Sequence, residues 1–453
     1  MIFNIRDFGA VGDGVQLDSP AIQRAIDAMA ASGEPGTVVV PPGKYLCGSI
    51  QCASDLTLQL EAGAFLKASS EITDFNERSE FAYLPFFFIG GFNCHNLTIT
   101  GPGTIDGNGF AFWEDGIYYN GTPGNEALLD QAHENNISYP LQPKERRPVL
   151  MMFVGCENII LRDFQIRDSA VYTIWPLACT HVRIENLDVK NYRQGPNSDV
   201  LDIDSSCDVI VSNCRIDAGD DCIALKTSHD RLSTPRPCER ICVTNCILTS
   251  PTCGIRIGFE GDAPIRDCVF SNLVIYDSGH GLDIISVTAR RKGMVISHGC
   301  DIEQILFSNI VMRNVAAAIY LWAGRFGAPA SDQPDYKAHV SDITFSGITA
   351  STMNVSFIGC VENNPHFVRN LTLRDVTLNC QRNSRSGNPT RFTKPYWTLS
   401  SPDALDILNV EGLFISNLRI SGGDLRGARI ENLTTDIPIL PIPEEDLAFL
   451  SQE

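Results

Sequence analysis

The sequence predicts an all-β protein, a parallel β-solenoid with a capping helix near its N-terminus. Two observations favour this fold: a short repeat of two apolar strands recurs nine times between residues 156 and 420, and no helical periodicity separates the strands. A third observation is one amphipathic segment ahead of the repeats whose residues suit a helix.

Each repeat is a short apolar strand, then Asn, Asp or Gly at the eighth position, then a second apolar strand. CENIILRDFQI (from residue 156), SCDVIVSNCRI (from 206) and IEQILFSNIVM (from 302) are examples. These three residue types tolerate the left-handed backbone conformation that a sharp bend needs. We therefore expect positive φ angles at the eighth positions, which are Asp163, Asn186, Asn213, Asn245, Asn272, Asn309, Gly347, Asp375 and Asn417.

The repeats begin 23 to 42 residues apart. A unit of this length cannot bury its own core, so it must stack on its neighbours. The regular leucine pattern of a leucine-rich repeat is absent. Residues 1–453 are therefore predicted to form a single β-helix domain with insertions of variable length.

The segment at 16–32, which contains DSPAIQRAIDAMAAS, is the expected cap helix. Ser19 suits the N-cap and Pro20 the first helical position. Such a helix can cover the open end of a solenoid, where an exposed sheet edge invites aggregation. The apolar residues that share one face are Ile22, Ala25, Ile26 and Met29.

Residues 107–147 break the repeat and are rich in aromatic and polar residues. A long irregular insertion in a compact fold is usually either functional or disordered. We expect this insertion near the cleft, where it can close one end of a groove.

The net charge of −19 leaves no basic excess to neutralise phosphates, which argues against nucleic acid and anionic membranes as partners. No run of 18 apolar residues occurs, and MIFNIRDFGAVGDG lacks the features of a secretory signal. A cytoplasmic location is expected, or secretion if a signal was removed. The sixteen cysteines include no CxxC pair typical of zinc sites, and many lie in strand-like runs, so we expect reduced thiols. No metal or cofactor is predicted, and the oligomeric state is not indicated.

The register of the repeats brings chemically active residues together. Asp199, Asp221, Cys253 and His280 fall in one column on successive coils, which neighbouring strands space by about 4.8 Å. Asp220 flanks the column. Three carboxyl groups on one patch suit hydrolysis of a glycosidic bond, because one protonates the departing oxygen while the others activate water. Turn residues or a calcium site would explain the same spacing.

At these residues the sequence resembles glycoside hydrolase family 28, the polygalacturonases and their relatives, over most of residues 1–290. The matching motifs are FNIRDFGAVGDG, GTVVVPPGKYLCGSI, LQLEAGAFL, GTIDGNGFAFW, YTIWPL, GPNSDVLDIDS and GDDCIALK. The resemblance implies a right-handed parallel β-helix and hydrolysis with inversion.

The family's Asn-Thr-Asp motif falls on Asn197, Ser198 and Asp199, and its Asp-Asp motif on Asp220 and Asp221. By resemblance, Asp220 is the general acid, while Asp199 and Asp221 hold and activate the attacking water. Asn197 is expected to contact the substrate.

Two motifs of the family are altered. Cys253 stands where the family has the histidine of Gly-His-Gly, while Asp283 and Ile285 replace an arginine and a lysine that grip the uronate carboxylate. The sequence therefore does not predict galacturonate specificity. Equal spacing from the repeat starts predicts that Arg256 lies beside Asp283, either paired with it or contacting a sugar. His280 is expected to replace the missing histidine, or else to be an ordinary satisfied side chain.

Lys226 is expected either to balance charge beneath the carboxylates or to pair with Asp204. Arg290 belongs to a basic loop that is either solvated or a second contact for a carboxylate. The candidate sugar-stacking aromatics, most of them expected in the core or at the rim, are Trp113, Tyr118, Tyr119, Trp175 and Trp322.

The sequence as a whole predicts an inverting glycoside hydrolase that acts on pectin-like or related oligosaccharides, with exo-action on small fragments. Two alternatives remain open at this stage. One is a polysaccharide lyase or fructotransferase-like β-helix enzyme, and the other is a noncatalytic carbohydrate-binding solenoid.

Overall fold

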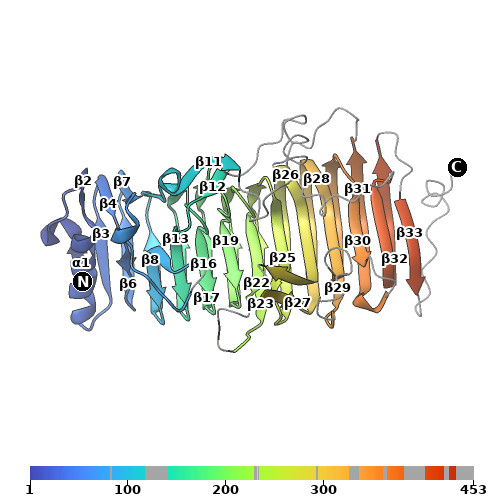
Figure 1. Ribbon diagram of the computed structural model, residues 1–453, viewed down its shortest axis with the longest axis horizontal. Coiled ribbons are helices and arrows are strands. Elements are labelled where there is room, and N and C mark those ends of the chain that lie inside the picture. Colours follow the sequence, from blue (N-terminus) through green and yellow to red (C-terminus); the bar gives the residue numbers. More distant parts are fainter. Residues whose placement is uncertain are drawn as a thin grey trace. The chain divides into compact units, whose positions relative to one another are not determined.

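The computed structural model describes residues 1–81, 84–117, 141–228, 232, 234–291, 294–325, 336–360, 365–381, 403–422 and 428–434. The chain divides into two compact units, one formed by Met1–Gly121 with Pro140–Ile223, and the other containing Ala224–Glu453. Each unit is built from coils of parallel strands, as in a right-handed parallel β-helix (Figure 1). The predicted fold class is confirmed. A single domain over 1–453 stays a prediction.

The first unit contains helix α1 (Ser19–Ala31) and the short 3-10 helices η1 (Ile5–Phe8), η2 (Ile72–Asp74) and η3 (Gly109–Phe112). Its strands are β1 (Ile2–Asn4), β2 (Asp13–Leu17), β3 (Gly36–Val40), β4 (Gly43–Cys47), β5 (Ile50–Gln51), β6 (Leu56–Leu60), β7 (Ala64–Ala68), β8 (Phe86–Phe92), β9 (His95–Thr100), β10 (Thr104–Asp106), β11 (Trp113–Ile117), β12 (Leu141–Pro143), β13 (Pro148–Val154), β14 (Glu157–Arg162), β15 (Gln165–Arg167), β16 (Ile174–Leu177), β17 (Thr180–Glu185), β18 (Asp188–Lys190), β19 (Leu201–Asp204), β20 (Cys207–Ser212) and β21 (Arg215–Asp217).

Strand β22 (Ile223–Thr227) begins at the last residue of the first unit. The second unit adds the 3-10 helix η4 (Pro365–Phe367). Its further strands are β23 (Cys238–Thr244), β24 (Ile247–Thr249), β25 (Cys253–Gly261), β26 (Ile265–Arg291), β27 (Met294–His298), β28 (Ile302–Arg325), β29 (Val340–Thr352), β30 (Ser356–Cys360), β31 (Val368–Cys380), β32 (Leu405–Ser421) and β33 (Ala428–Thr434).

The bends follow the sequence prediction. All nine eighth-position residues have positive φ angles, which range from 52° at Asn186 to 69° at Asp163. Their side chains also bond along the stack, since Asn186 Nδ2 donates to Asp163 Oδ1 at 2.8 Å and Asn309 Nδ2 donates to Asn272 Oδ1 at 2.6 Å. The bend residues therefore set the backbone turn and join neighbouring coils.

The core is made of equivalent residues stacked from coil to coil. In the second unit Phe270, Phe307 and Phe345 are in register, fully buried, and their ring centroids are 5.0 and 5.1 Å apart. These separations match the roughly 4.8 Å between neighbouring strands. All sixteen cysteines are free thiols and most are buried, as expected for residues in strand cores.

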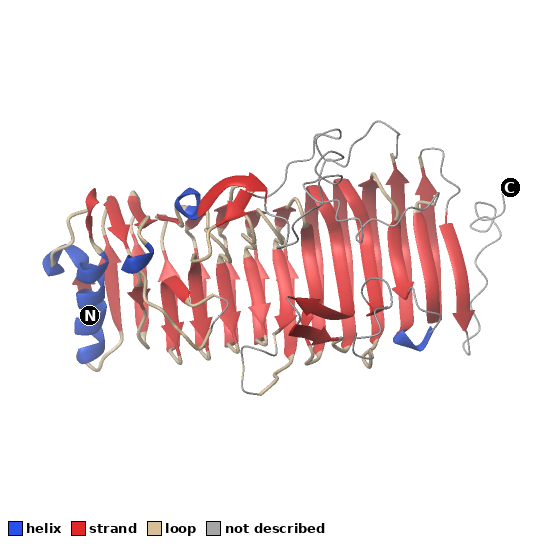
Figure 2. Ribbon diagram, in the orientation of Figure 1, coloured by secondary structure: helices blue, strands red, loops and turns tan. Residues whose placement is uncertain are grey.

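Helix α1 covers the first coils (Figure 2). Its buried face includes the four predicted apolar residues. The expected cap was wrong by one residue, because Asp18 and not Ser19 occupies the N-cap position. The Asp18 carboxylate accepts hydrogen bonds from the amides of Val11 and Gly12, while Ser19 Oγ accepts one from Gly48. Both side chains thus tie the helix start to neighbouring loops.

The predicted insertion at 107–147 is partly regular. It contains η3, β11 and β12, and the last two form an antiparallel pair in which Trp113 lies opposite Pro143. Residues 118–140 lie outside the described part of the chain. Among the described residues, no helix is long and apolar enough to cross a membrane.

Candidate active site

The three predicted catalytic carboxylates lie together in the first unit. Asp199 lies just before β19, and Asp220 and Asp221 lie between β21 and β22. The Val200 amide donates to the Asp221 carbonyl oxygen at 2.9 Å, and the next amide, that of Leu201, donates to Cys222 at 3.0 Å. This ladder puts Asp199 beside Asp221 on neighbouring coils. The predicted register between these two aspartates is therefore confirmed.

Glycines pack the two acidic loops tightly against each other. The Gly219 amide donates to the Ser198 carbonyl oxygen at 3.3 Å, and a Cβ at Gly219 would lie only 2.1 Å from Ser198 Oγ. Ser198 Oγ in turn donates to the Gly195 carbonyl oxygen at 2.9 Å. Because Gly219 directly precedes Asp220, this packing fixes the backbone position from which the Asp220 side chain extends.

The three carboxylates differ in exposure. Asp199 and Asp221 are only 4% and 7% exposed, whereas Asp220 is half-buried and reaches the surface. Next to them, Asn197 has a φ of 52°, a left-handed conformation that asparagine tolerates well. Two sheltered carboxylates beside one more accessible carboxyl group suit a site where water is held and a proton is delivered.

Arg147 is a member of this region that sequence reasoning missed. Its buried Nη1 donates to the carbonyl oxygens of Pro196 at 2.8 Å and Ala170 at 3.2 Å. It therefore supports the loop that leads into Asn197 and Asp199. The only signal in the sequence is the basic run KERRP at the end of the insertion.

A second group of buried charged residues lies in the second unit, and it matches the predicted register. Cys253 pairs with His280, and Arg256 pairs with Asp283 across β25 and β26. Arg256 Nη1 lies 3.2 Å from Asp283 Oδ2, which confirms that Arg256 lies beside Asp283 and shows the ion pair, one of the two roles expected for it. His280 Nδ1 lies 2.8 Å from the other oxygen of the same carboxylate.

Asp283 is fully buried, so its two carboxylate oxygens contact protein groups and not solvent. It orients the Arg256 guanidinium and the His280 imidazole, and the imidazole also stacks on Tyr320 with ring centroids 4.7 Å apart. Burial raises the pKa of Tyr320, and the nearby Asp283 carboxylate raises it further. The Tyr320 hydroxyl is therefore a weaker acid than that of an exposed tyrosine.

The other predicted binding residues have mixed outcomes. Lys226 Nζ lies 3.2 Å from Glu260 Oε2, a partner that the sequence did not suggest. The side chain of Arg290 lies outside the described residues. Whether Arg290, Lys226 or Asn197 contacts a substrate stays a prediction.

The candidate stacking aromatics are mostly core residues. Trp113, Trp175 and Trp322 are buried, in line with the expectation for most of the set. Trp175 Nε1 donates to the buried Asp204 carboxylate at 3.4 Å. Tyr118 and Tyr119 lie outside the described part of the chain.

Three further carboxyl groups lie at the ends of strands of the first unit. Burial raises the pKa of Asp106, of Asp168 and of Asp217. The Asp106 carboxylate raises the pKa of Asp168 further, whereas nearby basic residues such as Arg167 lower it. In the described part of the chain, no group of three or more His, Cys, Asp or Glu side chains has a metal-binding arrangement.

Comparison with known proteins places this chain in a family. The model of the family "Glycosyl hydrolases family 28" matches residues 31–398, which is well over half of the chain. The chain is 26% identical over 379 residues to a "Probable polygalacturonase" of Vitis vinifera, covering 79% of this chain and 70% of that protein. It is 26% identical over 346 residues to an "Exo-poly-alpha-D-galacturonosidase" of Dickeya chrysanthemi, covering 70% of this chain and 56% of that protein.

Solved structures show the same fold. A family 28 exopolygalacturonase of Yersinia enterocolitica superposes with a TM-score of 0.74 at 22% identity, covering 98% of this chain and 79% of that chain. The sequence motifs, the strand register and the family match agree. The chain belongs to glycosyl hydrolase family 28.

Proposed function

We propose that this glycosidase hydrolyses pectin-like oligosaccharides with inversion, acting from a chain end, with Asp220 as the general acid and Asp199 and Asp221 as the residues that activate water. The observation that carries this proposal is the ladder that sets Asp199 beside Asp221, with Asp220 adjacent. Family membership supports the reaction class.

The proposed step forms one bond and breaks one. A water molecule held by Asp199 and Asp221 loses a proton to one of these carboxylates as its oxygen attacks the anomeric carbon. The bond to the leaving oxygen breaks, and Asp220 in its protonated form donates the proton that this oxygen needs. Water enters on the face opposite the leaving group, so the anomeric configuration inverts.

The assignment of roles follows exposure. A general acid must reach the glycosidic oxygen of a bound chain, and Asp220 is the least buried of the three. A base that positions one water benefits from shelter, which Asp199 and Asp221 have. Two carboxylates on neighbouring coils can bind the same water from two sides.

The relatives support the substrate class and the mode of action. The relative from Dickeya chrysanthemi and the structure from Yersinia enterocolitica are both named for exo-action on polygalacturonate. The replacement of the family's arginine and lysine by Asp283 and Ile285 argues for a substrate unit other than an unmodified galacturonate at those contacts. Modified or neutral pectic oligosaccharides should therefore be the first substrates tested, in comparison with galacturonate oligomers.

Time-resolved NMR of the products tests the proposal. Pectic, rhamnogalacturonan and neutral oligosaccharides are offered to the intact enzyme, and the anomer of the first product is recorded before mutarotation. We expect single units released from one chain end, in the inverted form. A retained anomer would contradict the assigned roles of Asp199 and Asp221, and an unsaturated product that absorbs ultraviolet light would indicate a lyase instead.

The variant Asp220→Asn provides the matched test of the acid. Its side chain keeps the same size but has no acidic proton to transfer to the leaving oxygen, so kcat should fall by about 10²- to 10⁴-fold. Turnover equal to that of the intact enzyme would exclude Asp220 as the acid.

A further inference from the structure

The first unit carries an exposed aromatic pair beside the acidic loops. Phe110 in η3 is 54% exposed, and Tyr192, between β18 and β19, is 36% exposed. They are the only aromatic side chains among the exposed large hydrophobic residues of the described chain. Their ring centroids are 4.8 Å apart at an interplanar angle of 52°. The two exposed rings thus form one apolar surface.

This surface rests on a rigid base. The buried Trp113 lies 5.0 Å from Phe110 and 6.1 Å from Tyr192 between ring centroids, and its plane is only 28° from that of Tyr192. Trp113 Nε1 donates to the Ala170 carbonyl oxygen at 2.9 Å. A Cβ at Gly195 would lie 2.9 Å from the Trp113 ring, so the chain passes as close to it as glycine allows. The aromatic pair is therefore held in place.

The surface also adjoins the loops that carry the catalytic carboxylates. The Tyr192 carbonyl oxygen accepts a hydrogen bond from the Gly195 amide at 2.8 Å, and it would lie 2.5 Å from a Cβ at Gly219. Gly219 is the residue before Asp220, and Tyr192 and Asp199 both lie in the loop between β18 and β19. One short loop thus joins the aromatic pair to both acidic segments.

An exposed aromatic surface of this kind is suited to contact a sugar ring. Aromatic side chains are costly to expose and mark binding sites when they cluster next to polar groups. The face of a pyranose ring is lined by C–H groups, which an aromatic ring contacts well, while the sugar hydroxyls stay in water. Tyr192 Oη donates a hydrogen bond to Gln194 Oε1 at 2.8 Å, which restrains the ring while the side chain stays partly exposed.

We propose that Phe110 and Tyr192 form a sugar-binding subsite that stacks on one pyranose ring of the bound oligosaccharide, next to the unit whose bond is cleaved. This inference rests on the proposed hydrolysis and adds to it a contact that the catalytic carboxylates do not provide. The occupant is a glycosyl unit of the substrate chain, because the surface is continuous with the acidic loops and is formed by only two rings.

Binding to an inactive enzyme tests the subsite separately from hydrolysis. In the Asp220→Asn background, isothermal titration calorimetry measures affinity for the oligosaccharide that the intact enzyme cleaves fastest, or for trigalacturonate if none is cleaved. Phe110→Ala and Tyr192→Ala should each weaken binding by about 2- to 12-fold, the usual range for one aromatic contact. Tyr192→Phe keeps the ring and should bind within twofold of the parent.

The matched control is Ile210→Ala, which truncates an exposed apolar side chain on β20 of the same unit. It should leave affinity unchanged, and the unfolding temperature of every variant should stay near that of the parent. Unchanged affinity in both alanine variants, equal losses in Tyr192→Phe and Tyr192→Ala, or no binding at all would overturn the subsite. Aromatic-dependent binding without hydrolysis by the intact enzyme would retain the subsite and reject the proposed function.

Discussion

Removing the negative charge of Asp283 should destabilise the protein by about 3 kcal/mol. Asp283 is fully buried and contacts both Arg256 Nη1 and His280 Nδ1. Breaking a buried ion pair from one side typically costs about 3–5 kcal/mol, because the remaining charge is left in a poorly solvated place. In Asp283→Asn the new amide oxygen still accepts from His280, and the side chains of Arg256 and His280 are 8% and 12% exposed. These features put the expected loss at the lower end.

Urea unfolding, followed by circular dichroism, measures this loss as a change in the free energy of unfolding. The double variant Arg256→Met with Asp283→Asn removes the stranded charge and should recover at least half of the loss. The exposed carboxylate–histidine pair of Glu411 and His366, 2.7 Å apart in the same unit, supplies the control. Glu411→Gln should cost less than about 1 kcal/mol.

Two results would refute this reasoning. If Asp283→Asn lowered the free energy of unfolding by less than about 1 kcal/mol, the Arg256–Asp283 pair would not behave as a buried ion pair. If the double variant were no more stable than the single variant, the loss would arise from packing and not from the stranded charge of Arg256.

Three further predictions concern the acidic loops and the bends. Gly219→Ala forces a Cβ against Ser198 Oγ and should lower kcat by about 10²-fold by displacing the acid; wild-type kcat would contradict the packing argument. Burial raises the pKa of Asp168 in the folded protein above its value in the unfolded chain. The free energy of unfolding therefore decreases as pH rises from the unfolded pKa through the folded pKa, because the buried carboxyl group must then ionise. Asp168→Asn should therefore raise the urea midpoint at pH 7, with a gain that vanishes in acid; a gain independent of pH would disprove it. Asn309→Ala should cost about 1–2 kcal/mol because φ is 55°, and Asn309→Gly less; equal losses would show that the side-chain bond to Asn272 dominates.

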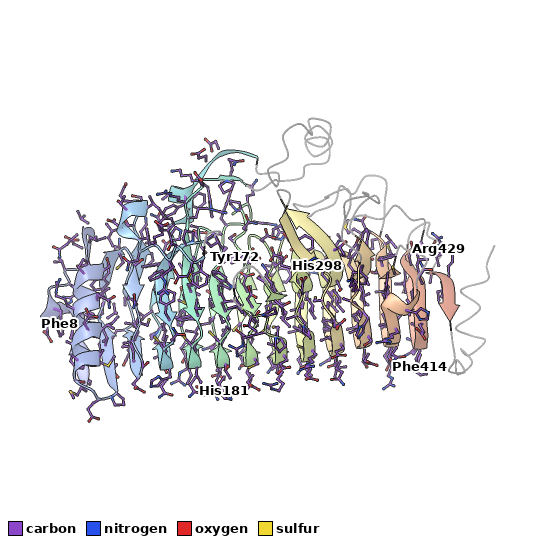
Figure 3. All side chains as sticks on the ribbon, turned by 60° about the horizontal axis from the view of Figure 1, so that its bottom comes forward. Phe8, Tyr172, His181, His298, Phe414 and Arg429 are labelled. Carbon is purple, nitrogen blue, oxygen red and sulfur yellow. The ribbon has the colours of Figure 1, made fainter. Side chains whose placement is uncertain are left out.

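Much of the site was predictable because a β-helix turns sequence spacing into spatial register. Counting from the repeat starts places Arg256 beside Asp283, and matching SDVLDI to DDCIAL places Asp199 beside Asp221, as the ladders confirm. Bends depend on local backbone preference, which a single residue carries. His181, labelled at the lower edge of the view in Figure 3, is the second residue of β17 and has a φ of 57° although it stands at no eighth position of a repeat.

Other features depended on contacts between segments far apart in the chain. The sequence placed Trp113 among the stacking candidates, but packing buries it and exposes Phe110 and Tyr192 above it. It gave Lys226 two possible roles, whereas the fold supplies Glu260 as a partner.

The sequence by itself determined the repeat, the bends and the register that gathers the acidic residues, because these follow from local preferences and fixed strand spacing. The tertiary structure decided which of these side chains are exposed and which partners they meet. Asp283 illustrates the difference: its neighbour Arg256 was predictable from spacing, but its contact with His280 and its complete burial were decided by the packing of the folded chain.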